Sequence, residues 1–132
     1  NWQDKNIEYT LTSKACYVKI KTLSFARALH NLISNAFKYA DKVIISTDLD
    51  KNNYIIDIED NGSGIKKEDR KIVFKPFYRG EKSRNLSNFA SVGLGLAITK
   101  EIIIGHYGRI LLHDSEKLKG LRVRIELPIN KN

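Results

Sequence analysis

The chain has 132 residues, which is long enough to bury a hydrophobic core of its own, and is predicted to form one domain. Its composition, 42% hydrophobic and 29% charged, is that of a soluble globular domain, and no apolar run approaches the length of a membrane span. The formal net charge is +8, but the basic residues are spread from Lys5 to Lys131 without interleaved aromatic residues, which disfavours nucleic-acid binding. Cys16 is the only cysteine, so no internal disulfide forms, and a reducing cytoplasm fits.

The first elements are predicted to be two short strands and a long helix. Residues 7–11 and 17–20 carry β-branched and aromatic residues and indicate strands joined by a turn at 12–14. A helix then begins at Thr22 or Ser24, either of which can cap it, and continues to residue 40. Its apolar members recur every three or four residues and form one stripe: Leu29, Leu32, Ile33, Ala36, Phe37 and Ala40.

The opposite face of this helix is a candidate binding surface. Asn31, Asn35 and Lys38 are spaced by four and then three residues, which places them on one face, with Tyr39 at its edge. Two asparagines inside a helix are unfavourable in propensity, and their carbonyl oxygens suit Mg²⁺. Lys38 can meet a phosphate as a point charge. The alternative is an ordinary solvated helix face.

Two strands, 42–49 and 54–59, are predicted to pair through a turn at 50–53. The second strand runs into Asp60-Asn61-Gly62-Ser63-Gly64-Ile65. A carboxylate accepts hydrogen bonds and donates none, so Asp60 suits an exocyclic amine such as that of adenine. The two glycines permit positive φ and close approach of another group. The alternative is a plain turn between a strand and a helix.

The second half begins with a short helix at 66–74 that ends before Pro76. An aromatic cluster of Phe74, Phe77 and Tyr78 and a polar loop from Glu81 to Ser91 come next. Gly93-Leu94-Gly95-Leu96 is predicted to open another helix, whose N-terminal N–H groups would form an anion site, although Gly-x-Gly alone is a weak signal. Residues 109–112 and 121–127 indicate a closing hairpin through 115–120.

This order of elements is not the alternation of a parallel βαβ domain. It predicts the α+β class: a two-layer α/β sandwich with a mixed, mainly antiparallel sheet of about five strands, packed on one face by three helices. Neither glycine motif continues into the Gly-Lys-Ser/Thr of a Walker A loop.

Taken together, four motifs resemble the ATP-binding catalytic domain of bacterial two-component sensor histidine kinases. This is the Bergerat nucleotide fold shared with gyrase, MutL and the large heat-shock chaperone, and the likeness is greatest to the osmosensor EnvZ type. The motifs stand in the family's order. The N box resembles His30-Asn31-Leu32-Ile33-Ser34-Asn35-Ala36-Phe37-Lys38-Tyr39, and the first G box resembles Asp60-Asn61-Gly62-Ser63-Gly64-Ile65. The F box resembles Phe74-Lys75-Pro76-Phe77-Tyr78-Arg79-Gly80, and the second G box resembles Gly93-Leu94-Gly95-Leu96-Ala97-Ile98.

The resemblance implies that the site binds Mg-ATP, with Asp60 on the adenine amino group and Gly62, Gly64 and Ile65 closing on the base. It makes Asn35 a Mg²⁺ ligand with Asn31 beside it, and residues 81–91 the ATP lid. Lys38 and Arg79 would stabilise phosphate charge. The remaining implied nucleotide contacts are Tyr39, Phe77, Gly93, Leu94, Gly95 and Leu96.

The implied reaction is transfer of the γ-phosphoryl group to a histidine on a separate dimerisation and phosphoacceptor domain, for relay to a response regulator. His30, His106 and His113 lack the phosphoacceptor context, so the acceptor is expected outside residues 1–132, together with the sensor domain. The chain alone is expected to be a cytoplasmic monomer, inactive without its acceptor and without direct membrane contact. Its parent protein is expected in the bacterial inner membrane.

Two other functions stay open: a Bergerat-type ATPase, and a degenerate nucleotide-binding or protein-interaction module. Asn31 stands where the ATPases have a water-activating glutamate, which disfavours the first. Ser91 stands where the family has a glycine, which favours the second. Ser63 in place of proline and Leu121 in place of threonine are further departures from the family pattern.

Overall fold

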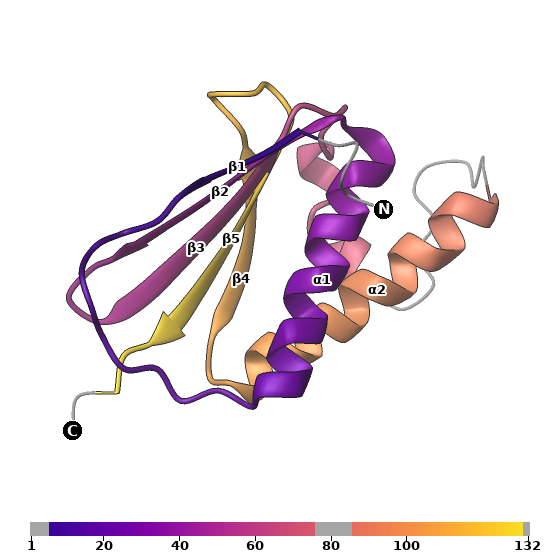
Figure 1. Ribbon diagram of the computed structural model, residues 1–132. Helices are drawn as coiled ribbons and strands as arrows, with labels where there is room; N and C mark the ends of the chain where they lie inside the picture. Colours follow the sequence, from indigo (N-terminus) through magenta and orange to yellow (C-terminus); the bar gives the residue numbers. More distant parts are fainter. Residues whose placement is uncertain (1–5, 76–85, 131–132) are drawn as a thin grey trace.

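The computed structural model describes residues 6–75 and 86–130, and of residues 86–95 it describes the backbone alone. A single five-stranded sheet has the order β1-β2-β3-β5-β4, in which β1 runs parallel to β2 and the other pairs are antiparallel. Two α-helices cover one face of the sheet (Figure 1). In chain order the elements are β1 (Asn6–Thr10), α1 (Thr22–Tyr39), β2 (Lys42–Leu49), β3 (Asn53–Asp60), the 3₁₀ turns η2 (Lys67–Asp69) and η3 (Ile72–Phe74), α2 (Leu86–Gly105), β4 (Arg109–Asp114) and β5 (Leu121–Pro128). The predicted two-layer α+β sandwich with a mixed, mainly antiparallel sheet is therefore confirmed.

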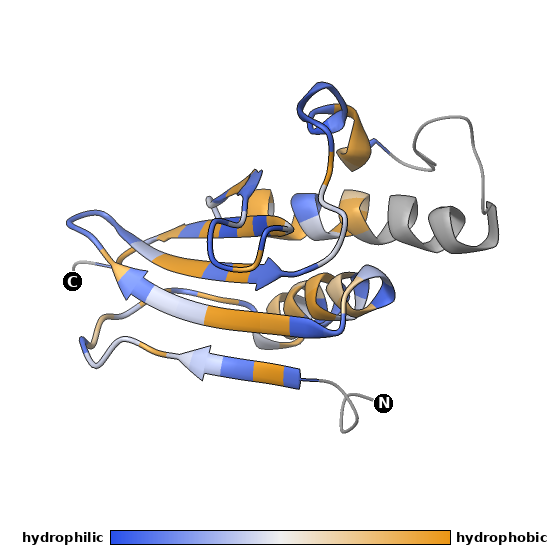
Figure 2. Cartoon of the chain, turned by 90° about the horizontal axis from the view of Figure 1, so that it is seen from above, coloured by the Kyte–Doolittle hydropathy of each residue, from blue (hydrophilic) through white to orange (hydrophobic). Residues whose placement is uncertain are grey.

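The core lies between the sheet and the two helices. Alternate residues of β5 are buried, as expected for a strand with one face on the core, and Figure 2 shows both hydrophilic and hydrophobic positions along the strands. Val43, Ile58 and Ile125 on the sheet and Ile103 on α2 are at most 2% exposed. On α1 the buried residues are Phe25, Ala28, Leu32, Ala36 and Phe37, of which the last three belong to the predicted stripe. The predicted Leu29 and Ile33 are only partly buried against the core, and Ala40 lies past the end of the helix.

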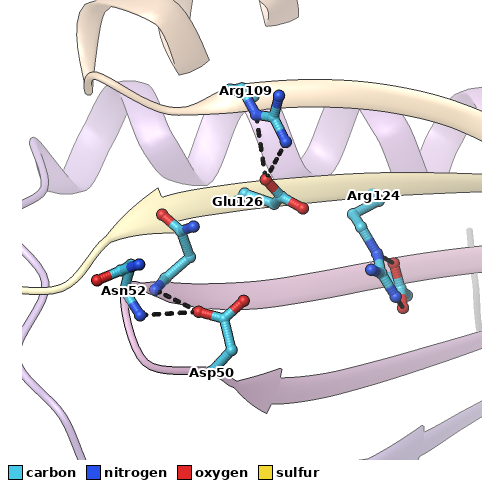
Figure 3. Close-up of polar contacts among 7 residues, drawn as sticks. Asp50, Asn52, Arg109, Arg124 and Glu126 are labelled. Atoms are coloured by element: carbon cyan, nitrogen blue, oxygen red, sulfur yellow. Dashed lines mark hydrogen bonds and ion pairs between the residues drawn. The ribbon is translucent and has the colours of Figure 1, made fainter.

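The opposite face of the sheet carries charged side chains that pair across strands. Arg124 on β5 makes two 2.9 Å hydrogen bonds to the carboxylate of Asp57 on β3. Arg109 on β4 bonds to Glu126 on β5 at 2.7 Å (Figure 3). The predicted turn between β2 and β3 is also present, and Asp50 accepts the backbone N–H groups of Asn52 and Asn53 there.

Three predictions in the first 75 residues were wrong. Residues 17–20 form no strand; instead, the backbone carbonyl of Tyr17 accepts the N–H of Asn130. The helix α1 has Lys21 at its N-cap without a side-chain cap, because the Ser24 hydroxyl donates to the Lys21 carbonyl rather than accepting an N–H. Residues 66–74 form two 3₁₀ turns rather than one helix, and the β-branched Ile72 and Val73 disfavour a longer helical run.

The start of α2 also differs from the prediction. The helix begins at Leu86, not at Gly93, so residues 86–91 are helical rather than part of a loop. Gly93 and Gly95 each cost only about 1 kcal/mol in a helix interior, which longer helices tolerate. Within the described residues, neither α-helix combines the length and apolar character required to cross a membrane.

Candidate functional site

The carboxylate of Asp60 is buried at the end of β3, on the helix-facing side of the sheet beside Val43. Its Oδ1 atom accepts the backbone N–H groups of Gly62, at 2.9 Å, and Leu121, at 3.3 Å. Burial raises the pKa of Asp60, and these two hydrogen bonds act in the opposite direction because they favour the charged form. The carboxylate is thus held by one oxygen, which leaves Oδ2 to accept a proton donor of a ligand.

The glycines after Asp60 are required by the local geometry. A Cβ atom at Gly62 would lie 2.9 Å from the carbonyl oxygen of Tyr39, so the turn packs against the end of α1. Gly64 has φ +76°, a conformation that side chains rarely adopt. The sequence motif therefore forms a turn that brings the end of β3 into contact with the end of α1.

Asn61 ties these two elements together. Its Oδ1 atom accepts the backbone N–H groups of Asp41 and Lys42, each at 3.2 Å, and its Nδ2 donates to the Asp41 carboxylate at 2.8 Å. An open cavity of about 450 Å³ lies beside this junction, lined by Phe37, Lys38, Tyr39, Ala40, Asp41 and Asn61. The cavity adjoins the Asp60 turn without including Asp60 itself.

On α1, Asn31 and Asn35 are both half-buried. The Oδ1 atom of Asn35 is buried and has no hydrogen-bond partner among the described residues. An unpartnered buried carbonyl oxygen is unfavourable in a folded protein unless a ligand completes it. Within residues 6–75 and 96–130, no three His, Cys, Asp or Glu side chains gather into a group able to hold a metal ion. The hard amide oxygen of Asn35 is the donor that fits Mg²⁺.

The structure describes some of the other predicted site residues and not others. Lys38 and Tyr39 are exposed at the end of α1, and partial burial raises the pKa of the Tyr39 phenol, which is therefore neutral near pH 7. Ile65 is half-buried against the core. Phe77 and Arg79 lie outside the described residues, as do residues 81–85 of the predicted lid. The segment 93–96 lies within α2, more than four residues from its start, so its N–H groups are not those of a helix N-terminus.

Two residues near Asp60 were not predicted as part of the site. Gly120 packs directly against Asp60, and Leu121 gives its backbone N–H to the carboxylate. For Gly120 the only signal in the sequence is a glycine just before the last strand, which by itself indicates the end of a hairpin turn. Leu121 was noted in the sequence as a departure from the family pattern but was not among the predicted site residues.

Comparisons with known proteins show which family the chain belongs to. Residues 20–131 match the family described as histidine kinase-, DNA gyrase B-, and HSP90-like ATPase. The chain belongs to this family.

Among its relatives, the chain is similar to sensor histidine kinases. It is 39% identical to the sensor histidine kinase CpxA of Escherichia coli over 105 residues, which are 79% of the chain and 22% of CpxA. The NMR structure of the histidine kinase domain of the E. coli osmosensor EnvZ has a TM-score of 0.72 at 36% identity, covering 98% of this chain and 79% of that one. The mycobacterial sensor histidine kinase MprB has a TM-score of 0.78 at 28% identity, covering 96% and 83%. The chain thus spans about a fifth of the length of CpxA.

Proposed function

We propose that residues 1–132 are the catalytic and ATP-binding domain of a sensor histidine kinase. In this role the domain binds Mg-ATP and presents the γ-phosphoryl group to a histidine on a separate dimerisation and phosphoacceptor domain, from which a response regulator receives it. The observation that carries the proposal is the Asp60 carboxylate, buried and held by one oxygen so that the other can accept the adenine amine. Family membership supports the same reading.

Some residues of the chain would bind the adenine base, and others would bind the phosphates. Asp60 orients the adenine, and the turn at Gly62 and Gly64 lets the backbone approach it. Asn35, with Asn31 one helical turn away, would hold Mg²⁺, which neutralises charge on the phosphates. Lys38 at the end of α1 and Arg79 would add positive charge. Phosphoryl transfer needs mainly such positioning and charge stabilisation.

In the transfer step the bond between the γ-phosphorus and the bridging oxygen breaks, ADP leaves, and a bond forms between phosphorus and the acceptor imidazole nitrogen. The imidazole is already a nucleophile, so the chain requires no general base. Asn31 is an amide and accepts no proton from water at neutral pH, so we expect negligible ATP hydrolysis by the isolated domain. Appreciable hydrolysis that Asn31→Ala abolishes would favour an ATPase instead.

The direct test is calorimetric titration of a non-hydrolysable ATP analogue into the domain, with and without Mg²⁺. We expect micromolar binding that strengthens with Mg²⁺ and is lost in Asp60→Ala. The matched control is Asp48→Ala, which removes an exposed carboxylate near the far end of β2. Failure of the wild-type domain to bind the nucleotide would leave an interaction module as the better function.

The location and assembly that go with this function are also proposals. The domain acts in the cytoplasm, and the parent protein sits in the bacterial inner membrane. Since dimerisation would come from the phosphoacceptor domain, the isolated chain is expected to sediment as a monomer.

A further inference from the structure

The turn between β4 and β5 is tightly closed by its own hydrogen bonds. The N–H of Ser115 donates to the carbonyl of Gly120 at 2.8 Å, and the N–H of Lys119 donates to the carbonyl of Ser115 at 2.8 Å. The Ser115 hydroxyl also accepts the N–H of Leu118 at 3.0 Å. Lys119 has φ +71°, a conformation in which a non-glycine residue is uncommon.

This turn is anchored to the strand that carries Asp60. Ser115 is 2% exposed, and its hydroxyl donates to Oε1 of Glu59 at 2.9 Å. Glu59 is 5% exposed and immediately precedes Asp60 on β3. Because a buried carboxylate is costly without a partner, this bond holds the turn to β3 more firmly than an exposed contact would.

Gly120, the last residue of the turn, packs directly against Asp60. A Cβ atom at Gly120 would clash first with the backbone carbonyl oxygen of Asp60, and it would lie 2.5 Å from Oδ1 of Asp60 and 2.7 Å from the backbone nitrogen of Gly62. These atoms are a backbone group and a doubly hydrogen-bonded carboxylate, neither of which moves easily. No side chain fits at position 120 unless Asp60 shifts, and the next residue, Leu121, supplies one of the two N–H groups that Oδ1 accepts.

We propose that the β4–β5 turn, through Gly120 and the Ser115–Glu59 hydrogen bond, fixes the orientation of the Asp60 carboxylate and thereby sets the preference of the site for adenine nucleotides. The proposal rests on the proposed function, since it concerns the same nucleotide site. Gly120 and Ser115 are positioning residues: they contact Asp60 or its strand and need not touch the nucleotide.

The test compares two ligands, Mg-ATP and the triphosphate of purine riboside, which lacks the exocyclic amine. The wild-type domain is expected to prefer ATP by about 10- to 100-fold, the range for one hydrogen bond to a charged group. In Gly120→Ala this preference should fall at least about tenfold through weaker ATP binding, while the affinity for the amine-free nucleotide stays within about twofold. Ser115→Ala should lower the preference in the same direction by a smaller factor.

The matched control is Gly105→Ala in α2, where an added Cβ would meet no atom within 4 Å and the preference should not change. If both nucleotides weaken equally in Gly120→Ala and Ser115→Ala, the turn is merely structural and the inference is wrong. If both variants keep the wild-type preference, it is also wrong, although the proposed function stands. Only absence of ATP binding by the wild-type domain would count against the proposed function itself.

Discussion

His106 near the end of α2 accepts the backbone N–H of Lys21 through Nε2, at 2.9 Å, and so holds the beginning of α1 to the end of α2. Its Nδ1 lies 2.8 Å from the carbonyl oxygen of Ile102 and therefore carries the hydrogen. The ring is buried and packs against Phe25 with a centroid distance of 5.5 Å. Only the neutral imidazole can accept at Nε2 in this way.

Removal of this ring should destabilise the domain. In His106→Ala the N–H of Lys21 loses its acceptor and Phe25 loses a ring contact, so the free energy of unfolding should fall by about 2 kcal/mol. Urea denaturation measures this change. The control His30→Ala removes an exposed histidine and should change the free energy of unfolding by less than about 0.5 kcal/mol. Equal effects in both variants would contradict the role of His106.

ATP affinity should depend on pH through Asp60. The raised pKa of Asp60 means that its carboxylate takes up a proton at a higher pH than an exposed aspartate does, and the protonated group loses an acceptor for the adenine amine. Affinity should therefore fall as the pH drops through this raised pKa. Calorimetry of wild-type and Asp60→Asn domains at a series of decreasing pH values from neutral tests this, because protonation of the nucleotide itself affects both proteins alike.

The same shift has the opposite sign for the stability of the ligand-free domain. The folded state binds the Asp60 proton more readily than the unfolded state, so this contribution to stability is present below the unfolded pKa and is lost as the pH rises through the folded pKa. A ratio of wild-type to Asp60→Asn affinities that does not change with pH would refute the assignment of Asp60 as the acceptor.

Asn35→Leu should separate stability from metal binding. The buried amide oxygen has no partner among the described residues, and an apolar group of similar size removes that cost. The free energy of unfolding of the ligand-free domain should stay level or rise by up to about 1 kcal/mol. Mg²⁺ should no longer strengthen ATP binding, whereas the ATP affinity measured in the presence of EDTA should change little. An intact Mg²⁺ response in this variant would exclude Asn35 as a ligand.

His113 should make the domain less stable in mild acid. Burial lowers the pKa of His113, and Arg122, Arg124 and Arg70 lower it further against the opposing effect of Asp57. The folded state thus binds this proton less readily than the unfolded state, so stability falls as the pH drops below about 6.5 toward the folded pKa. Urea midpoints of His113→Asn should fall less over this range than those of the wild type.

Local periodicity was sufficient to predict much of the fold. The stripe of α1 and the alternation along β2, β3 and β5 follow directly from residues that are neighbours in the sequence. The start of α2 was missed because glycine, serine and asparagine around residues 85–95 favour a loop locally. At residues 17–20 the error was the opposite, because a strand was predicted where none forms. Their short alternation resembles a strand, but β1 occupies the position beside β2.

The candidate site was predictable where its residues lie within one motif and not where they come from distant segments. Asp60 and Gly62 are two residues apart, so their turn is visible in the sequence. The contacts of Glu59 with Ser115 and of Asp60 with Gly120 join positions at least 56 residues apart, and they form only when β3 and β5 pair. The hydrogen bonds that Asn61 accepts from Asp41 and Lys42 could not be predicted either, because these residues are also distant from Asn61 in the sequence.

The three hydrogen bonds of Asn61 have a kinetic consequence. They join the end of β3 to the segment after α1 before any nucleotide arrives, so the half of the site that is proposed to bind adenine loses little conformational entropy on binding. Association of the base should then need no slow rearrangement, and rates of adenine-nucleotide capture should rise linearly with ligand concentration. An Asn61→Ala domain would first have to order this junction, and its observed binding rate should level off at high nucleotide concentration.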